Sequence, residues 1–240
     1  MASQALVWLI TGASRGIGLE LTKQLLDAPS HFVVAACRNP SSASGLKALA
    51  VTAKDRLHTV RMDVSDASSI RSCADEVSTI LGDRGVGVDY LINNAGIALR
   101  PDTAFSMNID DLLQTFVTNV AGPARVSQAF LPLVEKSGKK TIVNVSSLMG
   151  SIGADVSGVS NASYSISKTA LNMLTYKQAK EKPAVTTISI CPGWLQTDLG
   201  GQNAQYPVAV GVAGVIKTVQ SLTLADSGKF LNTKGEQYPW

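Results

Sequence analysis

The sequence predicts an α/β protein built on a doubly wound, mostly parallel β-sheet of about seven strands, with helices on both faces. Short apolar and β-branched segments alternate with longer segments of helical periodicity along the chain. Several of the short segments are apolar at nearly every position, which is typical of parallel strands that helices cover on both sides. No stretch rich in Pro, Gly and Ser divides the 240 residues, so we expect a single domain over residues 1–240.

Six strands can be placed in chain order from these segments. They cover residues 6–11, 32–37, 57–62, 90–93, 141–145 and 186–190, and the first two read LVWLIT and FVVAAC. Between them, apolar residues recur with the period of a helix. The helices are expected at residues 17–26, 70–81, 110–136 and 164–180. Two segments rich in Gly, Ser, Asn and Gln, 150–162 and 194–207, are expected to be loops at strand ends, where ligands bind in such sheets.

The composition excludes several classes of protein. Hydrophobic residues make up 45% of the chain and charged residues 16%, so the chain can bury a core and is unlike a disordered protein. The net charge is only +3 and the basic residues are scattered, which argues against nucleic-acid binding. Cys37, Cys73 and Cys191 have no partners at metal-ligand spacing, so we expect neither disulfides nor a metal site. Without a membrane-spanning run or a signal peptide, the chain is expected to be cytoplasmic, with no membrane partner.

The first strand runs directly into a glycine-rich turn, TGASRGIG, at residues 11–18. A strand, a glycine turn and a helix in this order are typical of the phosphate-binding start of a Rossmann-type fold. Gly12 would permit the tight turn, Gly16 would let the backbone approach a pyrophosphate, and Gly18 would let the helix pack closely on the strand. An ordinary strand-to-helix loop is the alternative interpretation.

The end of the second strand indicates which nicotinamide cofactor the chain would use. A cofactor without a 2′-phosphate usually has its ribose bound by an acidic residue at this position. Here Arg38 follows the strand and Arg15 in the glycine turn can reach the same region, so two cations replace the carboxylate. We therefore predict that the cofactor is NADP(H). The alternative is that Arg38 is a solvated loop residue without a role in cofactor binding. Asp63, after the third strand, is a candidate for the adenine edge or, alternatively, a helix cap.

Tyr164 and Lys168 are four residues apart in a predicted helix, so their side chains share one face. A free phenol has a pKa of about 10, and a fixed ammonium beside it would favour the phenolate and lower that pKa. Tyr164 could then act as a general acid or base. Alternatively, Tyr164 and Lys168 are an ordinary pair on a helix surface. A third polar side chain near them is needed to decide between the two interpretations.

The fifth strand supplies such a group, because it ends in Ser146 and Ser147 at the edge of the sheet where ligands bind. Neighbouring strand residues point to opposite faces, so only one of the two hydroxyls can serve the site. That hydroxyl could hydrogen-bond a substrate oxygen while the carbon that bears it gains or loses a hydride. Alternatively, both serines end the strand and cap the following turn.

Together these motifs resemble the short-chain dehydrogenase/reductase superfamily over essentially the whole chain. Six motifs occur in the order typical of that superfamily: the glycine turn 11–18, Asn93-Asn94-Ala95-Gly96, Asn119, Val145-Ser146-Ser147, Tyr164 with Lys168, and Pro192-Gly193 with Thr197. Two further stretches are similar to those of Sniffer- and C-factor-type carbonyl reductases and of fungal norsolorinic-acid-type ketoreductases, namely Pro192 to Asp198 and Gly228 to Trp240.

The resemblance implies NADP(H)-dependent reduction of an aldehyde or ketone, or the reverse oxidation. It implies that Ser147 donates to the substrate oxygen, that Tyr164 is the acid/base, and that Lys168 lowers the Tyr164 pKa and holds the nicotinamide ribose. Asn119 would complete a proton relay, with a helix-interior asparagine as the alternative, and for Asn94 the alternative is a turn cap. The residues implied to border the cofactor are Gly12, Ser14, Arg15, Gly16, Ile17, Gly18, Arg38, Asp63, Val64, Asn94, Ala95, Gly96, Tyr164, Lys168, Pro192, Gly193 and Thr197.

The spacing of the catalytic candidates departs from the superfamily pattern. Ser147 lies 17 positions before Tyr164, a few more than is usual, and the extra length falls in residues 150–161. Ser151 lies nearer to the usual spacing and is therefore a rival. We prefer Ser147 because Ser151 follows Gly150 beyond the strand.

Two other functions are compatible with parts of this pattern. A non-catalytic NADP-binding or scaffold protein of the same fold would be expected to lack Tyr164 or Lys168, and both are present. Epimerase or dehydratase relatives usually carry a larger C-terminal substrate domain than the residues after Thr197 provide. The expected partner is a small-molecule carbonyl or alcohol substrate, and the resemblance leaves a monomer, a homodimer and a homotetramer open.

Overall fold

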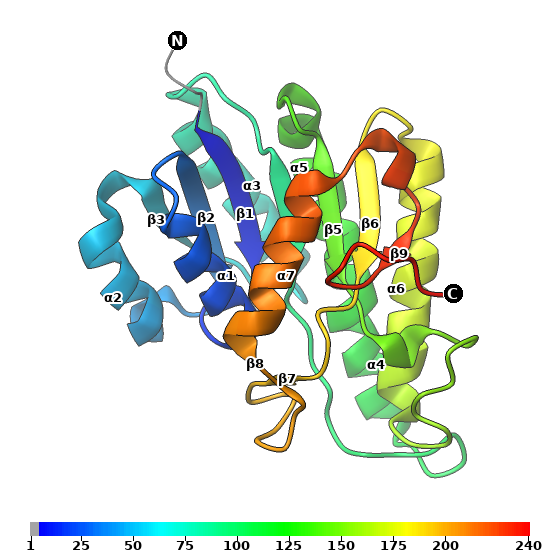
Figure 1. Ribbon diagram of the computed structural model, residues 1–240. Coiled ribbons are helices and arrows are strands. Elements are labelled where there is room, and N and C mark those ends of the chain that lie inside the picture. Colours follow the sequence, from blue (N-terminus) through cyan, green and yellow to red (C-terminus); the bar gives the residue numbers. More distant parts are fainter. Residues whose placement is uncertain (1–4) are drawn as a thin grey trace.

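The computed structural model describes residues 5–240 and has a seven-stranded sheet at its centre (Figure 1). The strands are β1 (Leu6–Thr11), β2 (His31–Cys37), β3 (Leu57–Arg61), β4 (Tyr90–Asn93), β5 (Thr141–Val145), β6 (Thr186–Ile190) and β9 (Phe230–Leu231). Their order in the sheet is β3-β2-β1-β4-β5-β6-β9, and each neighbouring pair is parallel. The predicted doubly wound sheet is therefore confirmed, with its change of direction between β1 and β4.

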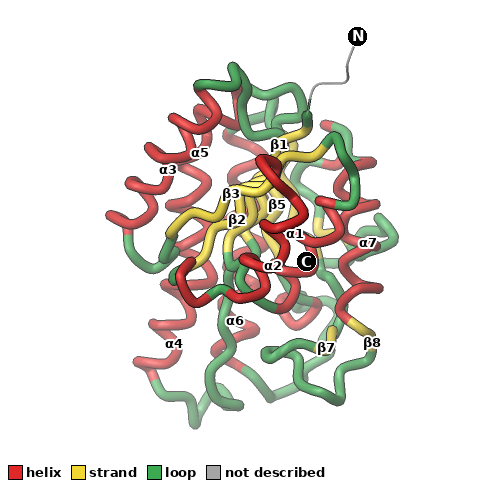
Figure 2. The backbone as a smooth tube through the Cα atoms, turned by 90° about the vertical axis from the view of Figure 1, so that its left-hand side faces the viewer, coloured by secondary structure: helices red, strands yellow, loops and turns green. Residues whose placement is uncertain are grey.

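Helices cover both faces of this sheet. They are α1 (Gly16–Leu26), α2 (Ser44–Ala53), α3 (Ala67–Gly82), α4 (Ile109–Phe116), α5 (Gly122–Lys136), α6 (Ala162–Glu181) and α7 (Val208–Ser221). Trp8 and Ile10 of β1 share an apolar core with α1, α2 and α7, whereas Val7 and Leu9 share one with α3 and α5, as the two-residue period of a strand requires. Figure 2 shows α3 and α5 on one side of the sheet and α7 on the other. Within residues 5–240, no helix is long and apolar enough to cross a membrane.

The structure differs from the sequence-based expectation in a few elements. The helix expected at 110–136 is divided into α4 and α5 by a π-helical segment, Val117–Ala121. α2, α7 and the two-residue strand β9 were not expected, and the predicted loop at 194–207 contains the short parallel strands β7 (Leu195–Gln196) and β8 (Tyr206–Pro207).

Buried polar side chains join the central strands to α5 and α6. The Nδ2 of Asn93 on β4 donates to the Oδ1 of Asn144 on β5 at 2.8 Å and to the Ser127 hydroxyl of α5 at 3.1 Å. The Nδ2 of Asn144 donates to the Thr175 hydroxyl of α6 at 2.9 Å, and the Ser189 hydroxyl of β6 donates to the same oxygen at 2.8 Å. Buried groups that satisfy one another in this way fix the register of the strands whose ends carry the candidate site.

Candidate functional site

The predicted site residues come together at the carboxyl ends of the parallel strands, at the lower edge of the sheet in Figure 1. The glycine turn follows β1, Asn94 follows β4, Ser147 follows β5, and Pro192 follows β6. α6 then brings Tyr164 and Lys168 to the same edge. Segments that are far apart in the sequence therefore form one continuous site region.

The glycine turn has the geometry of an anion cradle. Gly12 and Gly16 adopt φ values of +67° and +53°, which residues with a side chain rarely adopt. Gly18 is required by close packing, because a methyl group on it would lie 2.4 Å from the carbonyl oxygen of Gly12 and 2.7 Å from the Nδ2 of Asn94. Arg15 precedes α1 in an extended conformation, and no side chain caps this helix. Main-chain N–H groups at an uncapped helix start fit a pyrophosphate.

Asn94 ties this turn to the end of β4. Its Nδ2 donates to the carbonyl oxygens of Thr11 at 2.9 Å and of Gly12 at 3.3 Å. In return, the Thr11 hydroxyl oxygen accepts hydrogen bonds from the main-chain N–H groups of Asn94 and Ala95, both at 3.0 Å. The Asn94 side chain thus caps the turn, as the alternative interpretation of this residue predicted. The sequence did not indicate this role of Thr11; the signal that could have done so is a hydroxyl at the strand end before the first glycine.

The two arginines predicted to select NADP(H) are both exposed at this edge. Arg38 directly follows β2. The Nε of Arg15 lies 3.4 Å from the Oδ2 of Asp198 in the loop after β7, an ion pair that the sequence did not indicate. Because both side chains of this pair are largely exposed, the attraction is weak, and Arg15 can exchange Asp198 for a phosphate.

Asp63 closes the turn that follows β3. Its Oδ1 accepts from the main-chain N–H of Ser65 at 2.9 Å and from the Ser65 hydroxyl at 2.6 Å. The N-cap of α3 is Asp66, so Asp63 caps a turn and not the helix itself. Val64 beside it is buried. Contacts of Asp63 and Val64 with adenine stay predictions.

Tyr164, Lys168 and Ser147 form one cluster. Tyr164 lies in the first turn of α6 and is half-buried, and the side chain of Ser147 lies close enough to it to lower its pKa. Lys168, one turn later, is buried, and its Nζ donates to the carbonyl oxygen of Val145 at 2.8 Å. The same Nζ lies 5.6 Å from the centre of the Tyr164 ring. This contact network holds the three polar side chains at the end of β5.

The electrostatics of this cluster differ from expectation. Burial raises the pKa of Tyr164 to about 12, and the hydrogen bond with Ser147 acts in the opposite direction. Burial also lowers the pKa of Lys168 to about 8. The predicted lowering of the Tyr164 pKa is therefore wrong for this arrangement, because desolvation of the phenolate outweighs the lowering effect of Ser147. At neutral pH, Tyr164 carries a proton that it can donate, and Lys168 is mostly charged.

Three serines near this cluster have different partners. The buried Ser146 directs its hydroxyl to the carbonyl oxygen of Lys168 at 3.5 Å. Ser147 contacts Tyr164 and also caps the following 3₁₀ turn. The hydroxyl of Ser151 instead donates to the carbonyl oxygen of Pro239 at 2.7 Å. The geometry favours Ser147 over Ser151 as the hydroxyl that serves Tyr164.

The loop 150–161 is held at its base from two sides. From α6, the Nδ2 of Asn172 donates to the carbonyl oxygen of Gly150 at 3.1 Å. From the C-terminal segment, the carbonyl oxygen of Trp240 accepts from the N–H of Gly153 at 3.0 Å. The bond from Gly153 to Trp240 and a second one, from the Ser151 hydroxyl to Pro239, form a clasp between the loop and the C-terminal segment, residues 239–240.

Asn119 lies in the π-helical segment, a form of helix that is frequent at functional sites. Its Oδ1 accepts from the N–H of Ile97 and its Nδ2 donates to the carbonyl oxygen of Ile97, both at 2.8 Å. The Nδ2 also donates to the Ser167 hydroxyl at 3.0 Å. A methyl group on Gly96 would lie 3.3 Å from the Oδ1 of Asn119 and 3.6 Å from the Nζ of Lys168. Asn119 thus fixes the chain after β4 beside Lys168, and its part in a proton relay stays a prediction.

The loop after β6 returns to the glycine turn. It begins with the buried Pro192 and with Gly193, whose φ is +91°. A methyl group on Gly16 would lie 3.5 Å from the Cγ2 of Thr197, so Thr197 borders the turn. Its hydroxyl oxygen accepts from the N–H of Gly200 at 3.1 Å. The predicted contact of Thr197 with a nicotinamide amide is compatible with this position and stays a prediction.

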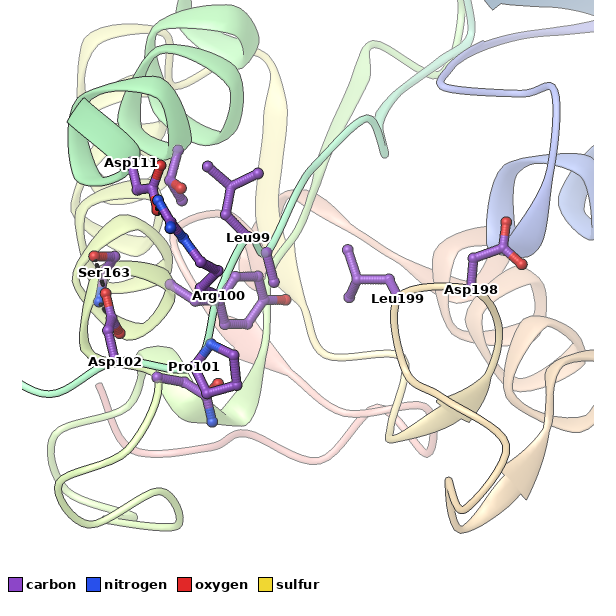
Figure 3. A pocket seen from close by; sticks show the side chains of 12 residues that line it. Leu99, Arg100, Pro101, Asp102, Asp111, Ser163, Asp198 and Leu199 are labelled. Atoms are coloured by element: carbon purple, nitrogen blue, oxygen red, sulfur yellow. Dashed lines mark hydrogen bonds and ion pairs between the residues drawn. The ribbon is translucent and has the colours of Figure 1, made fainter. Parts of the chain in front are cut away.

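A cavity of about 260 Å³ opens beside Tyr164 (Figure 3). Figure 3 shows the Arg100 side chain directed toward Asp111 of α4, and the Nη2 of Arg100 lies 2.6 Å from the Oδ2 of Asp111. The walls of the cavity combine apolar and polar side chains from four segments: Ala98, Leu99, Arg100, Pro101, Asp102, Asp111, Thr115, Asn161, Ser163, Tyr164, Asp198 and Leu199. A small molecule could therefore approach Tyr164 from this cavity.

Comparison with known proteins identifies relatives of the same architecture. A family model described as short chain dehydrogenase matches residues 6–206. Norsolorinic acid ketoreductase from Aspergillus parasiticus is 32% identical over 255 residues, which are 98% of this chain and 91% of that protein. An NADPH-bound carbonyl reductase from chicken fatty liver has a TM-score of 0.92 at 35% identity, covering 99% of this chain and 100% of that chain. Carbonyl reductase Sniffer of D. melanogaster has the same TM-score and coverage at 29% identity. These matches confirm the resemblance drawn from the motifs.

Proposed function

Because the chain belongs to the short-chain dehydrogenase family, we propose that it is an NADP(H)-dependent carbonyl reductase, which reduces an aldehyde or ketone to the alcohol or catalyses the reverse oxidation. The observation that carries this proposal is the cluster of Ser147, Tyr164 and Lys168 beside the cavity. A hydroxyl donor, an acid and a cation are the groups that a carbonyl oxygen requires when the carbonyl carbon receives a hydride and negative charge develops on the oxygen.

The residues present fit NADP(H). The glycine turn and the uncapped start of α1 suit the pyrophosphate, and Arg15 and Arg38 suit a 2′-phosphate. The buried ammonium of Lys168 beside Gly96 suits the ribose hydroxyls. When bound, the nicotinamide supplies the hydride. The similar carbonyl reductase from chicken fatty liver, whose structure is described as NADPH-bound, supports this choice of cofactor.

In the direction of reduction, each residue of the cluster has a distinct task. Ser147 donates a hydrogen bond to the carbonyl oxygen as negative charge develops on it. Tyr164, protonated because its pKa is about 12, donates its proton to that oxygen. Lys168 keeps its charge at neutral pH and stabilises the phenolate that Tyr164 becomes.

The proposed function is tested by measuring NADPH oxidation with a panel of aldehydes, quinones and aromatic ketones. With any substrate that reacts, Ser147→Ala should lower kcat about 10²- to 10³-fold, because one donor to the substrate oxygen is lost, and should leave NADPH binding intact. Ser151→Ala is the matched control, since its hydroxyl bonds to Pro239, and it should have a much smaller effect. Activity lost in the control and kept in Ser147→Ala would refute the assignment of Ser147.

Cofactor preference supplies a second test. We expect the protein to prefer NADPH to NADH, and Arg38→Asp should weaken that preference about tenfold or invert it, because a charge-assisted hydrogen bond is replaced by repulsion. The measurement is kcat/KM for both cofactors in the unmodified protein and in the variant. Equal use of NADPH and NADH by the unmodified protein would contradict the proposed 2′-phosphate site.

The pH dependence of reduction follows from the buried lysine. The pKa of Lys168 is about 8, so the side chain is charged below this pH and loses its proton above it. Tyr164 stays protonated over the whole range because its pKa is about 12. We therefore expect kcat/KM for the carbonyl substrate at saturating NADPH to be constant below pH 7 and to fall about tenfold per pH unit above pH 8. A flat profile from pH 6 to pH 10 would show that the Lys168 charge is not required.

A further inference from the structure

The helix that carries Tyr164 is not capped by the side chain of its own N-cap residue. The N-cap residue of α6, Asn161, has a φ of 57° and a ψ of 41°, and its side chain makes no capping hydrogen bond. A capping residue normally has an extended backbone, which directs its side chain to the N–H groups of the first turn. The left-handed conformation of Asn161 does not provide this direction.

Asp102, 61 residues before Ser163 and in the chain after β4, supplies the missing acceptors. Its Oδ1 accepts from the main-chain N–H of Ser163 at 3.2 Å, and its Oδ2 accepts from the Ser163 hydroxyl. Its carbonyl oxygen also accepts from the N–H of Ala162 at 3.4 Å. A carboxylate at the start of a helix is stabilised further by the helix dipole. Figure 3 shows Asp102 and Ser163 facing each other at the wall of the cavity.

The position of this contact connects it to the reacting group. Ser163 is buried and directly precedes Tyr164. The segment 98–102 and Tyr164 line the same cavity. One carboxylate therefore joins the first turn of α6 to this segment of the cavity wall, and loss of the carboxylate would release both.

We infer that Asp102 is a positioning residue for Tyr164, which acts through Ser163 and sets the place of the phenol relative to the substrate. This inference rests on the proposed reductase function. If Asp102 served stability alone, its loss would have the same effects as the loss of Asp66. The Asp66 carboxylate caps α3 by accepting from the N–H of Ser68 at 2.8 Å. Asp66 thus provides a matched control on a helix that carries none of the proposed catalytic residues.

The experiment compares Asp102→Ala, Asp102→Asn and Asp66→Ala by thermal unfolding, hydrogen–deuterium exchange, NADPH titration and carbonyl reduction. Both alanine variants should lower the Tm by roughly 2–4 °C, because each removes a helix cap. Only Asp102→Ala should accelerate amide exchange at residues 162–166, about tenfold, since the first turn would open more often without the bond from the Ser163 N–H to the carboxylate. Only Asp102→Ala should lower kcat, by about 10- to 100-fold, because a small displacement of the acid suffices for such a loss. Its NADPH dissociation constant should stay unchanged.

Asp102→Asn keeps an oxygen that can accept from the Ser163 N–H, so it should restore slow exchange and most of kcat. If Asp102→Ala does not fold, Ser163→Ala removes one of the two side-chain hydrogen bonds and should show a smaller change in the same two measurements. Exchange at residues 162–166 and a kcat equal to those of the unmodified protein in Asp102→Ala would overturn the inference. An unmodified chain that reduced no carbonyl would refute the proposed function alone, and the exchange measurement would still decide the role of Asp102.

Discussion

Replacing Tyr164 by phenylalanine is expected to lower kcat for carbonyl reduction about 10²- to 10⁴-fold, because the proposed proton donor to the substrate oxygen is lost. The substitution removes one hydroxyl from a half-buried ring. The helix and its packing should remain, so the Tm and the NADPH dissociation constant should change little. Stopped-flow measurement of NADPH oxidation, together with fluorescence titration of the bound nicotinamide, checks both parts.

Lys168→Met is the comparison that separates the proposed role of Tyr164, proton donation, from the proposed roles of Lys168 in catalysis and cofactor binding. It removes a buried charge and, by the proposed assignment, a contact to the ribose, so it should raise the NADPH dissociation constant as well as lower kcat. A Tyr164→Phe protein that reduced a good substrate at a near-normal rate would eliminate the proposed mechanism, because another acid would have to protonate the substrate.

Gly18→Ala is expected to have the largest effect on stability, about 3 kcal/mol. The added methyl group would lie 2.4 Å from the carbonyl oxygen of Gly12 and 2.9 Å from the Cα of Ala13. Only a movement of the main chain could relieve these contacts, and that movement would open the glycine turn. The same displacement should weaken NADPH binding, because the turn is the proposed pyrophosphate cradle. Urea unfolding and NADPH titration measure the two losses.

Gly82→Ala is the matched control for this substitution. Gly82 ends α3 and is exposed, and a methyl group there would meet no atom within 4 Å. Its free energy of unfolding should change by less than about 1 kcal/mol, in the stabilising direction favoured by the helix propensity of alanine. Equal effects of the two substitutions would show that close packing at Gly18 is not what the turn requires.

The sheet could be predicted from the sequence because its strands are buried on both faces and read as continuous apolar segments. α7 could not, since its sequence VAVGVAGVIKTVQS combines β-branched residues with glycine, which local propensity disfavours in a helix. Tertiary packing decides its structure: a methyl group on Gly211 would lie 2.5 Å from the side chain of Leu195, and one on Gly214 would lie 2.7 Å from that of Thr233. β9 has only two residues and is defined by pairing with β6.

In the candidate site too, some features could be predicted from short sequence motifs, whereas others depend on contacts between segments that are distant in the sequence. The glycine turn and the Tyr164–Lys168 pair depend on short spacings, so the sequence could identify them as motifs. The direction of the Tyr164 pKa shift depends on burial by surrounding elements, which no spacing reveals. The cap from Asp102 and the ion pair of Arg15 with Asp198 join segments that are distant in the sequence, and a single carboxylate in a loop carries no local sign of its partner.

The clasp between the loop 150–161 and the C-terminal segment also has a thermodynamic consequence for the site. The loop joins Ser147 to Tyr164, and the entropy lost when its ends are held in place grows with the length that moves freely. Hydrogen bonds from Ser151 and Gly153 to the C-terminal segment shorten that length. Because local opening must break these bonds together, the loop and the C-terminal segment form one cooperative unit, and the free energy of opening the loop includes that of releasing the last residues of the chain.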